Sequence, residues 1–237
     1  KIGLAVPIFN HLAYGRGWSI GDLNENYMPP RTNWPVYGNV ARFTVSKDTV
    51  TVVPKYLADK NLFYQLWSFE KTSPTITKPI HGDQWVIKTD TGVSRFTREV
   101  PFTLENDFLG RLIADTLKKS IYRYLSRKHA GFGVVQNYYL TPISHDEYFF
   151  KQRGFPGASV IHSQPTDSLL KPMMHRSDNF FAEQALLMVA NEHIGYMNDE
   201  DIIDTLLKTD FKDLPQKPRW ADGSGLSRYN LFTPQDI

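Results

Sequence analysis

The chain reads Ser177-Asp178-Asn179-Phe180-Phe181-Ala182-Glu183-Gln184 where its most strongly patterned helix begins, and this helix is predicted over residues 179–192. Ser, Asp and Asn are typical of a helix N-cap, because their side chains accept hydrogen bonds from free backbone N–H groups. Ser177 and Asn179 also suit a substrate cleft, since a hydroxyl can relay a proton and an amide can hold a substrate carbonyl. The residues alone leave both interpretations open.

The pattern around this helix predicts a mixed chain. A second helix is expected over residues 199–208, and a short helical turn over residues 169–174 is expected to be interrupted at Pro172. Towards the N-terminus, residues 39–53 predict a β-hairpin with a polar turn at 46–48, and residues 84–96 predict a second one. A helix is expected over residues 104–119, followed by strands over 121–125 and 133–140. The fold class is therefore α/β (α+β).

Composition excludes several kinds of protein. Among 237 residues, 27 basic and 25 acidic side chains leave a net charge of +2, which argues against a polyanion-binding protein. Lys118, Lys119 and Arg123 alternate with Tyr122 and Tyr124, a pattern that could stack on single-stranded nucleic acid, but a solvated face explains it equally well. We therefore expect no nucleic-acid partner.

Cofactor sites are not expected either. The chain has no cysteine, which removes disulfides, thiolate nucleophiles and cysteine-ligated zinc. The seven histidines lack metal-binding spacing, and the short glycine pairs lack the remaining residues of a phosphate loop. No apolar stretch approaches the roughly 20 residues that span a bilayer. We expect neither a metal nor another cofactor, and no transmembrane segment in this chain.

The last residues predict the start of another helix. Thr233 precedes Pro234, and Asp236 follows two residues later, as in an N-cap, a first-position proline and a first-turn acid. We therefore expect an internal fragment of a longer protein. The chain starts at Lys1 without a methionine, so an export signal could lie upstream.

Three blocks of sequence resemble one enzyme family. The segment Leu169-Leu170-Lys171-Pro172-Met173-Met174-His175-Arg176-Ser177-Asp178-Asn179 resembles the second active-site motif of the penicillin-binding D-Ala-D-Ala carboxypeptidase/endopeptidase family (peptidase family S13). Ala221-Asp222-Gly223-Ser224-Gly225-Leu226-Ser227-Arg228 is similar to its Asp-Gly-Ser-Gly-Leu-Ser-Arg block, and Gly17-Trp18-Ser19-Ile20-Gly21-Asp22-Leu23 resembles its Gly-Trp-x-Trp-x-Asp-Leu block. The resemblance covers about residues 15–237.

The resemblance implies a serine acyl-transfer enzyme that cuts D-Ala-D-Ala bonds or cross-links in peptidoglycan stem peptides. Such an enzyme needs a Ser-x-x-Lys nucleophile motif, Ser-x-Asn, and Lys-Thr-Gly on a strand, close together. We reject Ser68-Phe69-Glu70-Lys71 as the nucleophile, because Pro74 follows too soon for a helix and Glu70 favours a charged lysine. Lys208-Thr209-Asp210 lacks the glycine and precedes the Asp-Gly-Ser-Gly block. Both true motifs are expected outside the fragment.

The resemblance also assigns roles to six residues. Ser177 matches the proton-relaying serine and Asn179 the asparagine that binds the substrate amide, so both are predicted to be catalytic. Four residues are predicted to bind substrate: Asp22, Tyr27, Arg228 and Ser224. A carboxylate and an aromatic face suit the ammonium of a diaminopimelate side chain, and an arginine suits its carboxylate. Ile20 replaces the second tryptophan of the family's block, so one wall of this pocket differs.

The domain assignment follows the resemblance. We expect an inserted subdomain over residues 1–35 and 99–162, a nested β-rich subdomain over 36–98, and part of the penicillin-binding catalytic domain over 163–237. The expected partners are peptidoglycan stem peptides and β-lactams, and the expected location is the periplasm or cell envelope. Two alternatives stay open: a non-catalytic peptidoglycan-binding homologue, and a structural or adaptor module in which Ser177 merely caps a helix.

Overall fold

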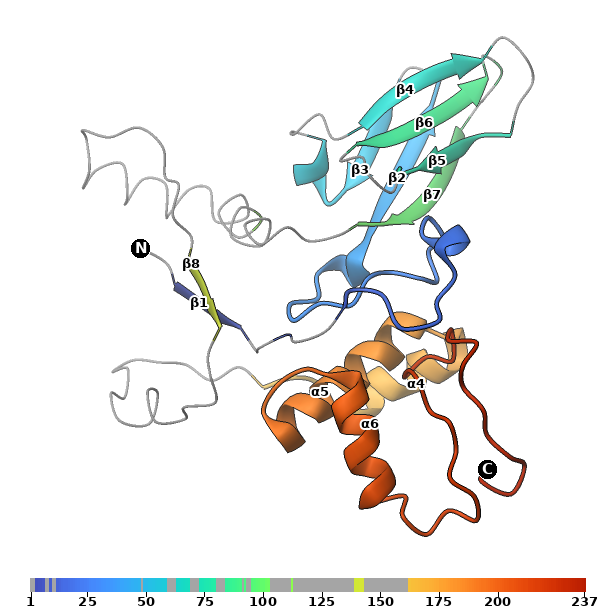
Figure 1. The fold of residues 1–237 in the computed structure, drawn as a ribbon. Helices are drawn as coiled ribbons and strands as arrows, with labels where there is room; N and C mark the ends of the chain where they lie inside the picture. Colours follow the sequence, from blue (N-terminus) through green and yellow to red (C-terminus); the bar gives the residue numbers. More distant parts are fainter. Residues whose placement is uncertain are drawn as a thin grey trace, which may run out of the picture. The chain divides into compact units, whose positions relative to one another are not determined.

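The computed structural model describes residues 3–6, 9, 12–47, 49–58, 63–68, 73–79, 84–90, 92, 95–102, 112, 139–142 and 162–237 (Figure 1). The chain divides into two compact units. The first comprises Lys1–Leu4, Gly21–Pro30 and Val36–Tyr139, and the second comprises Ala5–Ile20, Arg31–Pro35 and Leu140–Ile237. The chain therefore passes between the units several times. The subdomain boundaries expected from the resemblance stay a prediction.

The first unit holds a three-stranded antiparallel sheet. Strand β2 (Val40–Ser46) lies between β3 (Val50–Val53) and β7 (Arg95–Pro101), with the pairings Phe43↔Val52 and Phe43↔Arg98. Successive side chains of a strand point to opposite faces, and along β2 the alternate residues Ala41, Phe43 and Val45 are buried. The hairpin predicted over residues 39–53 is thus confirmed. Three short 3-10 turns precede or follow it: η1 (Ile20–Asp22), η2 (Tyr37–Asn39) and η3 (Lys55–Leu57).

A second sheet in the same unit has the order β4-β6-β5. Strand β4 (Phe63–Ser68) runs parallel to β6 (Trp85–Asp90), and β5 (Thr75–Thr77) runs antiparallel to it. The hairpin predicted over residues 84–96 is therefore wrong, because β6 and β7 belong to different sheets. Both sheets share one core, in which the ring of Phe43 lies 5.5 Å from that of Trp85 and 5.6 Å from that of Phe63.

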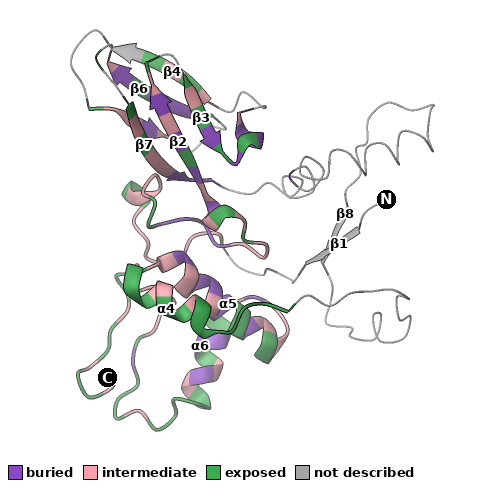
Figure 2. Cartoon of the chain, turned by 180° about the vertical axis from the view of Figure 1, so that it is seen from behind, coloured by how far each residue is buried: buried purple, intermediate pink, exposed green. Residues whose placement is uncertain are grey.

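The second unit contains the helices α4 (Asp167–Arg176), α5 (Asn179–Ile194) and α6 (Asp199–Lys208). Helix α5 ends at Gly195, whose φ of 87° places it in the left-handed region, and Asn198 then caps α6. Figure 1 shows α6 against α5, and their shared core consists of Leu186, Ala190, Ile202, Ile203 and Leu206. In Figure 2 buried residues alternate with exposed ones along α6, as in an amphipathic helix, whereas α5 buries the polar side chains of Glu183 and Gln184 beside its apolar ones.

Helices α5 and α6 confirm the sequence predictions, whereas α4 corrects one. The turn predicted over residues 169–174 is a helix of ten residues that runs through Pro172 instead of ending there. The prediction failed because proline excludes one backbone hydrogen bond and favours a break, without enforcing one. At the C-terminus, residues 233–236 form a turn in which the Asp236 carboxylate accepts hydrogen bonds from the N–H and hydroxyl of Thr233.

One further pair of strands is described. Strand β1 (Gly3–Val6) pairs with β8 (Tyr139–Pro142) in a two-stranded sheet. The helix predicted over residues 104–119 and the strand over 121–125 lie outside the described residues, apart from Leu112, and so does most of the strand over 133–140. Among the described helices, none has the length and apolar character needed to cross a bilayer.

Candidate functional site

Ser177 lies in the tight turn between α4 and α5. Its φ of 52° is in the left-handed region, which is uncommon for a residue other than glycine and is held by the surrounding structure. The backbone N–H groups of Ser177 and Asp178 both donate to the carbonyl of Met173, in the last turn of α4. These bonds fix the turn, and Ser177 remains exposed in it.

Asp178, not Ser177, caps helix α5. Its Oδ1 accepts a hydrogen bond of 3.0 Å from the backbone N–H of Phe181, and its own backbone is extended, as expected of an N-cap residue. Within the described part of the chain, the Ser177 hydroxyl has no hydrogen-bond partner. Asn179, at the first position of the helix, is half buried. The capping interpretation of Ser177 is therefore wrong, and its hydroxyl is left for another use.

A buried arginine anchors α5 and α6. The Nη1 atom of Arg31 donates to Glu183 Oε2 at 3.3 Å and also to Asp199 Oδ2, and its Nη2 atom donates to the carbonyl of Leu12 at 3.0 Å. All three charged side chains are almost fully buried. Burial raises the pKa of Glu183, although a hydrogen bond from Ser224 and the charge of Arg31 act in the opposite direction. Two carboxylates therefore share one buried cation.

The buried carboxylate of Asp222 organises the loop that follows. Its Oδ2 accepts hydrogen bonds from Trp18 Nε1 at 2.8 Å and the Ser227 N–H at 2.6 Å. Its Oδ1 accepts from the Gly225 N–H at 2.8 Å and from Asn230 Nδ2 at 2.7 Å. Four donors thus converge on one side chain that is 2% exposed. Trp18 and Asp222 belong to two of the blocks quoted above, so the structure joins these blocks directly.

The loop that contains Asp222 also contacts helix α5. The backbone N–H of Ser224 donates to Glu183 Oε1 at 2.7 Å. A methyl group on Gly223 would come within 2.7 Å of the carbonyl oxygen of Ala182, so only glycine allows this close approach. Ser224 is therefore held beside the helix that begins just after Ser177. Trp18 of the first block and the whole of the other two blocks therefore lie in the second unit.

The four predicted substrate-binding residues fall in two units. Asp22 and Tyr27 lie in the first unit, where partial burial, the charge of Asp22 and a hydrogen bond to it raise the pKa of Tyr27. Arg228 and Ser224 lie in the second. Arg228 is exposed, and its guanidinium forms no salt bridge with any described residue. A pocket shared by all four stays a prediction.

The two rejected motifs do not have the required secondary structure. Ser68 is the last residue of strand β4 and lies in no helix. Lys208 ends helix α6, whereas the family's Lys-Thr-Gly motif lies on a strand. Lys208 is exposed, with its Nζ 3.8 Å from Asp204 Oδ2.

A second Ser-x-x-Lys string escaped the sequence reasoning. Ser168-Leu169-Leu170-Lys171 lies in α4, so its serine and lysine share a helix face, as the motif requires. Both side chains are exposed. Ser168 and Ser177 lie at opposite ends of α4, and at 1.5 Å per residue their separation along the axis is about 13 Å. This distance is too long for a proton relay between the two hydroxyls, so Ser168 does not fit the role of a nucleophile that works with Ser177.

Several large apolar side chains around this site are exposed. They are Leu170 and Met174 of α4, Met188 and Val189 of α5, and Leu231 and Phe232 after the Asp222 loop. Met174, three residues before Ser177, is 76% exposed.

Among the described residues, no group of three or more His, Cys, Asp or Glu side chains could hold a metal ion. The described residues of the second unit offer hydroxyls, amides and fixed charges. Ser177 and Asn179 supply the first two, and Arg228 supplies a free cation. These are the groups that sequence reasoning selected, whereas the Arg31 and Asp222 networks that hold the site together went unnoticed.

Comparison with known proteins extends these observations. Residues 155–237 match the model of the D-Ala-D-Ala carboxypeptidase 3 (S13) family. The fold is similar to the crystal structure of penicillin binding protein 4 (dacB) from Haemophilus influenzae, with a TM-score of 0.64 and 20% identity over 99% of this chain and 51% of that one. A structure of that protein complexed with a novel β-lactam matches with a TM-score of 0.58 and 15% identity, over 100% of this chain and 50% of that one.

The chain thus spans about half the length of the solved structures that it matches. No curated protein sequence matches it. At these identities the structural likeness shows a shared fold, and this confirms the predicted α/β (α+β) class. Over residues 155–237 the chain matches the sequence model of the D-Ala-D-Ala carboxypeptidase 3 (S13) family, which confirms the predicted resemblance for the two blocks in that range.

Proposed function

We propose that the protein containing this chain is a serine-type D-Ala-D-Ala carboxypeptidase/endopeptidase that acts on peptidoglycan stem peptides through an acyl-enzyme. One observation supports this proposed function most directly. Asp178 supplies the cap of α5, so the adjacent Ser177 hydroxyl is exposed and free at the place where the family's relay serine is expected. A residue that served only as a cap would accept the hydrogen bond that Asp178 accepts.

The proposed roles follow from side-chain chemistry. During acylation, the neighbouring base takes the proton of the nucleophilic serine. The Ser177 hydroxyl gives its own proton to the leaving amine and receives the proton held by the base in exchange. The Asn179 amide holds the substrate's peptide group, because it can donate and accept hydrogen bonds at once. Arg228 pairs with a substrate carboxylate as a charge-assisted fork. Ser224, fixed beside α5 through Glu183, lines the same cleft.

Asp22 and Tyr27 complete the proposed substrate site. A carboxylate beside an aromatic ring attracts an ammonium by charge and by cation–π contact, which suits the amine of a diaminopimelate side chain. The Tyr27 hydroxyl, hydrogen bonded to Asp22, keeps its proton well into the basic range, because these contacts raise its pKa.

The nucleophile and the strand lysine are proposed to come from sequence other than residues 1–237. Neither Ser68 nor Ser168 meets the requirements, for the reasons given above. The proposed location is the periplasm or cell envelope, where peptidoglycan lies, and β-lactams are the expected inhibitors, because they acylate the same serine as the substrate.

Labelling with a fluorescent penicillin tests this function. The full-length gene product should gain one covalent adduct, visible on a gel and as a single mass increase, whereas residues 1–237 alone should gain none. A full-length protein that stays unlabelled would favour a non-catalytic peptidoglycan-binding homologue. An adduct on residues 1–237 would overturn the assignment of the nucleophile, and peptide mapping would show whether it lies on Ser68 or Ser168.

A further inference from the structure

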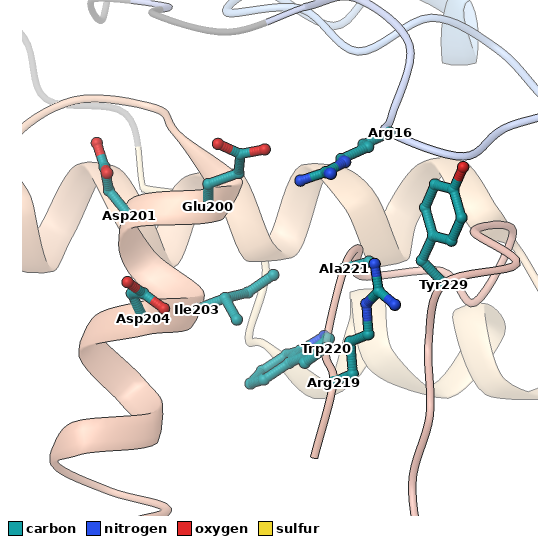
Figure 3. Close-up of a pocket in the computed structure, with 9 residues that line it drawn as sticks. All are labelled: Arg16, Glu200, Asp201, Ile203, Asp204, Arg219, Trp220, Ala221 and Tyr229. Atoms are coloured by element: carbon teal, nitrogen blue, oxygen red, sulfur yellow. The ribbon is translucent and has the colours of Figure 1, made fainter. Parts of the chain in front are cut away.

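A pocket of about 360 Å³ lies in the second unit, apart from the residues assigned above (Figure 3). One side is formed by helix α6, with Glu200, Asp201 and Asp204. The other side is formed by Arg16, Arg219 and Tyr229, and Ile203 and Trp220 lie between the two sides. Neither Ser177 nor Asn179 lines it. The pocket is at the small end of the range for sites that bind small organic molecules.

On the basic side of this pocket, both arginine side chains lie over the ring of Tyr229. The guanidinium carbon of Arg219 lies 5.1 Å from the centre of the Tyr229 ring, and that of Arg16 lies 5.9 Å from it. Stacking of this kind orients a guanidinium and leaves its N–H groups free to donate in the plane. Within the described part of the chain neither guanidinium forms a salt bridge, so two oriented cations face the pocket.

The acidic side has the opposite charge. Asp201 accepts a hydrogen bond of 2.8 Å from the Tyr196 hydroxyl, which fixes its position, and Asp204 lies 3.8 Å from Lys208. Glu200, in the first turn of α6, is exposed, and its carboxylate has no partner among the described residues. Figure 3 shows Glu200 and the Arg16 side chain reaching into the space between α6 and Tyr229. The two charged sides are therefore separated by the apolar surface of Ile203 and Trp220.

From this arrangement we infer that the pocket binds a short zwitterionic peptide. Its carboxylate lies between Arg16 and Arg219, its ammonium faces Glu200, and its aliphatic part rests on Ile203 and Trp220. A simple anion would be repelled by the three carboxylates of α6, and a simple cation by the two arginines. Only a ligand with both charges satisfies both sides. This site is independent of the acyl-transfer chemistry proposed above.

Dialanine of the L configuration is a suitable probe, because it is zwitterionic and lacks the D-Ala-D-Ala stereochemistry of the proposed substrate. Binding of this dipeptide to the chain is measured by isothermal titration calorimetry, beside N-acetyl-dialanine, which has no ammonium, and dialanine amide, which has no carboxylate. We expect each derivative to bind about tenfold more weakly, the effect of losing one charge-assisted contact. Equal binding of all three peptides, or binding of none, overturns the inference.

Two pairs of variants locate the site. Arg219→Gln and Glu200→Gln should each weaken dialanine binding about tenfold. Lys217→Gln and Asp213→Asn, which change exposed charges outside the pocket, should leave binding unchanged. If the controls weaken binding as much as the pocket variants, general electrostatic attraction explains the result and the pocket assignment is wrong. Thermal unfolding of each variant verifies that it is folded. The comparison of the three peptides uses the unmodified chain, so it tests the inference even if a variant does not fold.

Discussion

The four hydrogen bonds accepted by Asp222 make its carboxylate the most consequential single group of the second unit. Asp222→Asn keeps the size of the side chain but replaces one oxygen by an NH₂ group. Whichever way the amide turns, one pair of donors loses its acceptor, either Trp18 Nε1 with the Ser227 N–H or the Gly225 N–H with Asn230 Nδ2. The substitution therefore removes two hydrogen bonds, and the new NH₂ group faces the two N–H donors that have lost their acceptor.

A hydrogen bond to a charged acceptor is worth about 1.5–3 kcal/mol. Because three of the four donors are only partly buried and can regain water, the lower end applies, and Asp222→Asn should cost about 3 kcal/mol. This is a large share of the roughly 5–15 kcal/mol that stabilises an ordinary domain. Urea denaturation of the chain, followed by circular dichroism, measures the loss. Asp213→Asn, an exposed acid in the same unit, should change stability by less than about 0.5 kcal/mol.

A double-mutant cycle with Trp18→Phe isolates one of these bonds. Trp18→Phe alone should destabilise the chain, and adding it to Asp222→Asn should cost less than the sum of the two single changes, because the bond is already weakened. A loss below about 1 kcal/mol for Asp222→Asn, or strictly additive effects, would refute the reasoning that Asp222 joins the two sequence blocks.

Two further predictions concern contacts of α5. Because burial raises the pKa of Glu183 in the folded state, its contribution to stability is present below its ordinary pKa of 4.5 and is lost as pH rises through the folded value. The stability of the unmodified chain should therefore fall relative to Glu183→Gln as pH rises above about 4.5, as measured by urea denaturation; a difference independent of pH would contradict this. Gly223→Ala should destabilise the chain by about 1–3 kcal/mol, because its methyl group meets a backbone oxygen, whereas Gly92→Ala should cost less. Equal thermal stability of both glycine variants would show that the loop moves freely away from α5.

Local patterns predicted the elements whose partners are close in sequence. Helix α6 appears at the predicted residues, and the hairpin of β2 and β3 has the predicted polar turn. Both were predictable because helical periodicity and hairpin turns depend only on residues that are close together in the sequence. The pairing of β6 was not predictable in this way. Its neighbours are β4, more than 15 residues earlier and parallel to it, and β5, so no short turn identifies them.

The candidate site was predictable only in part for the same reason. The resemblance selected Ser177 and Asn179, whose positions at the start of α5 the structure confirms. Arg31 gave no signal, because a buried arginine that bridges two helices depends on carboxylates more than 150 residues away. The cap was ambiguous between adjacent side chains, and only the hydrogen bond to Phe181 identified Asp178.

Turnover by the full-length protein with Ser177→Ala tests the central claim most directly. Release of D-alanine from a peptide ending in D-Ala-D-Ala should fall about a hundredfold or more, because the relay of the proton to the leaving amine is lost. Ser168→Ala, at the other end of α4, is the matched control and should leave turnover unchanged. The melting temperature of Ser177→Ala should stay close to that of the unmodified protein, since Asp178 supplies the cap. Unchanged turnover in Ser177→Ala, or equal losses in both variants, would contradict the assignment of Ser177 as the proton relay.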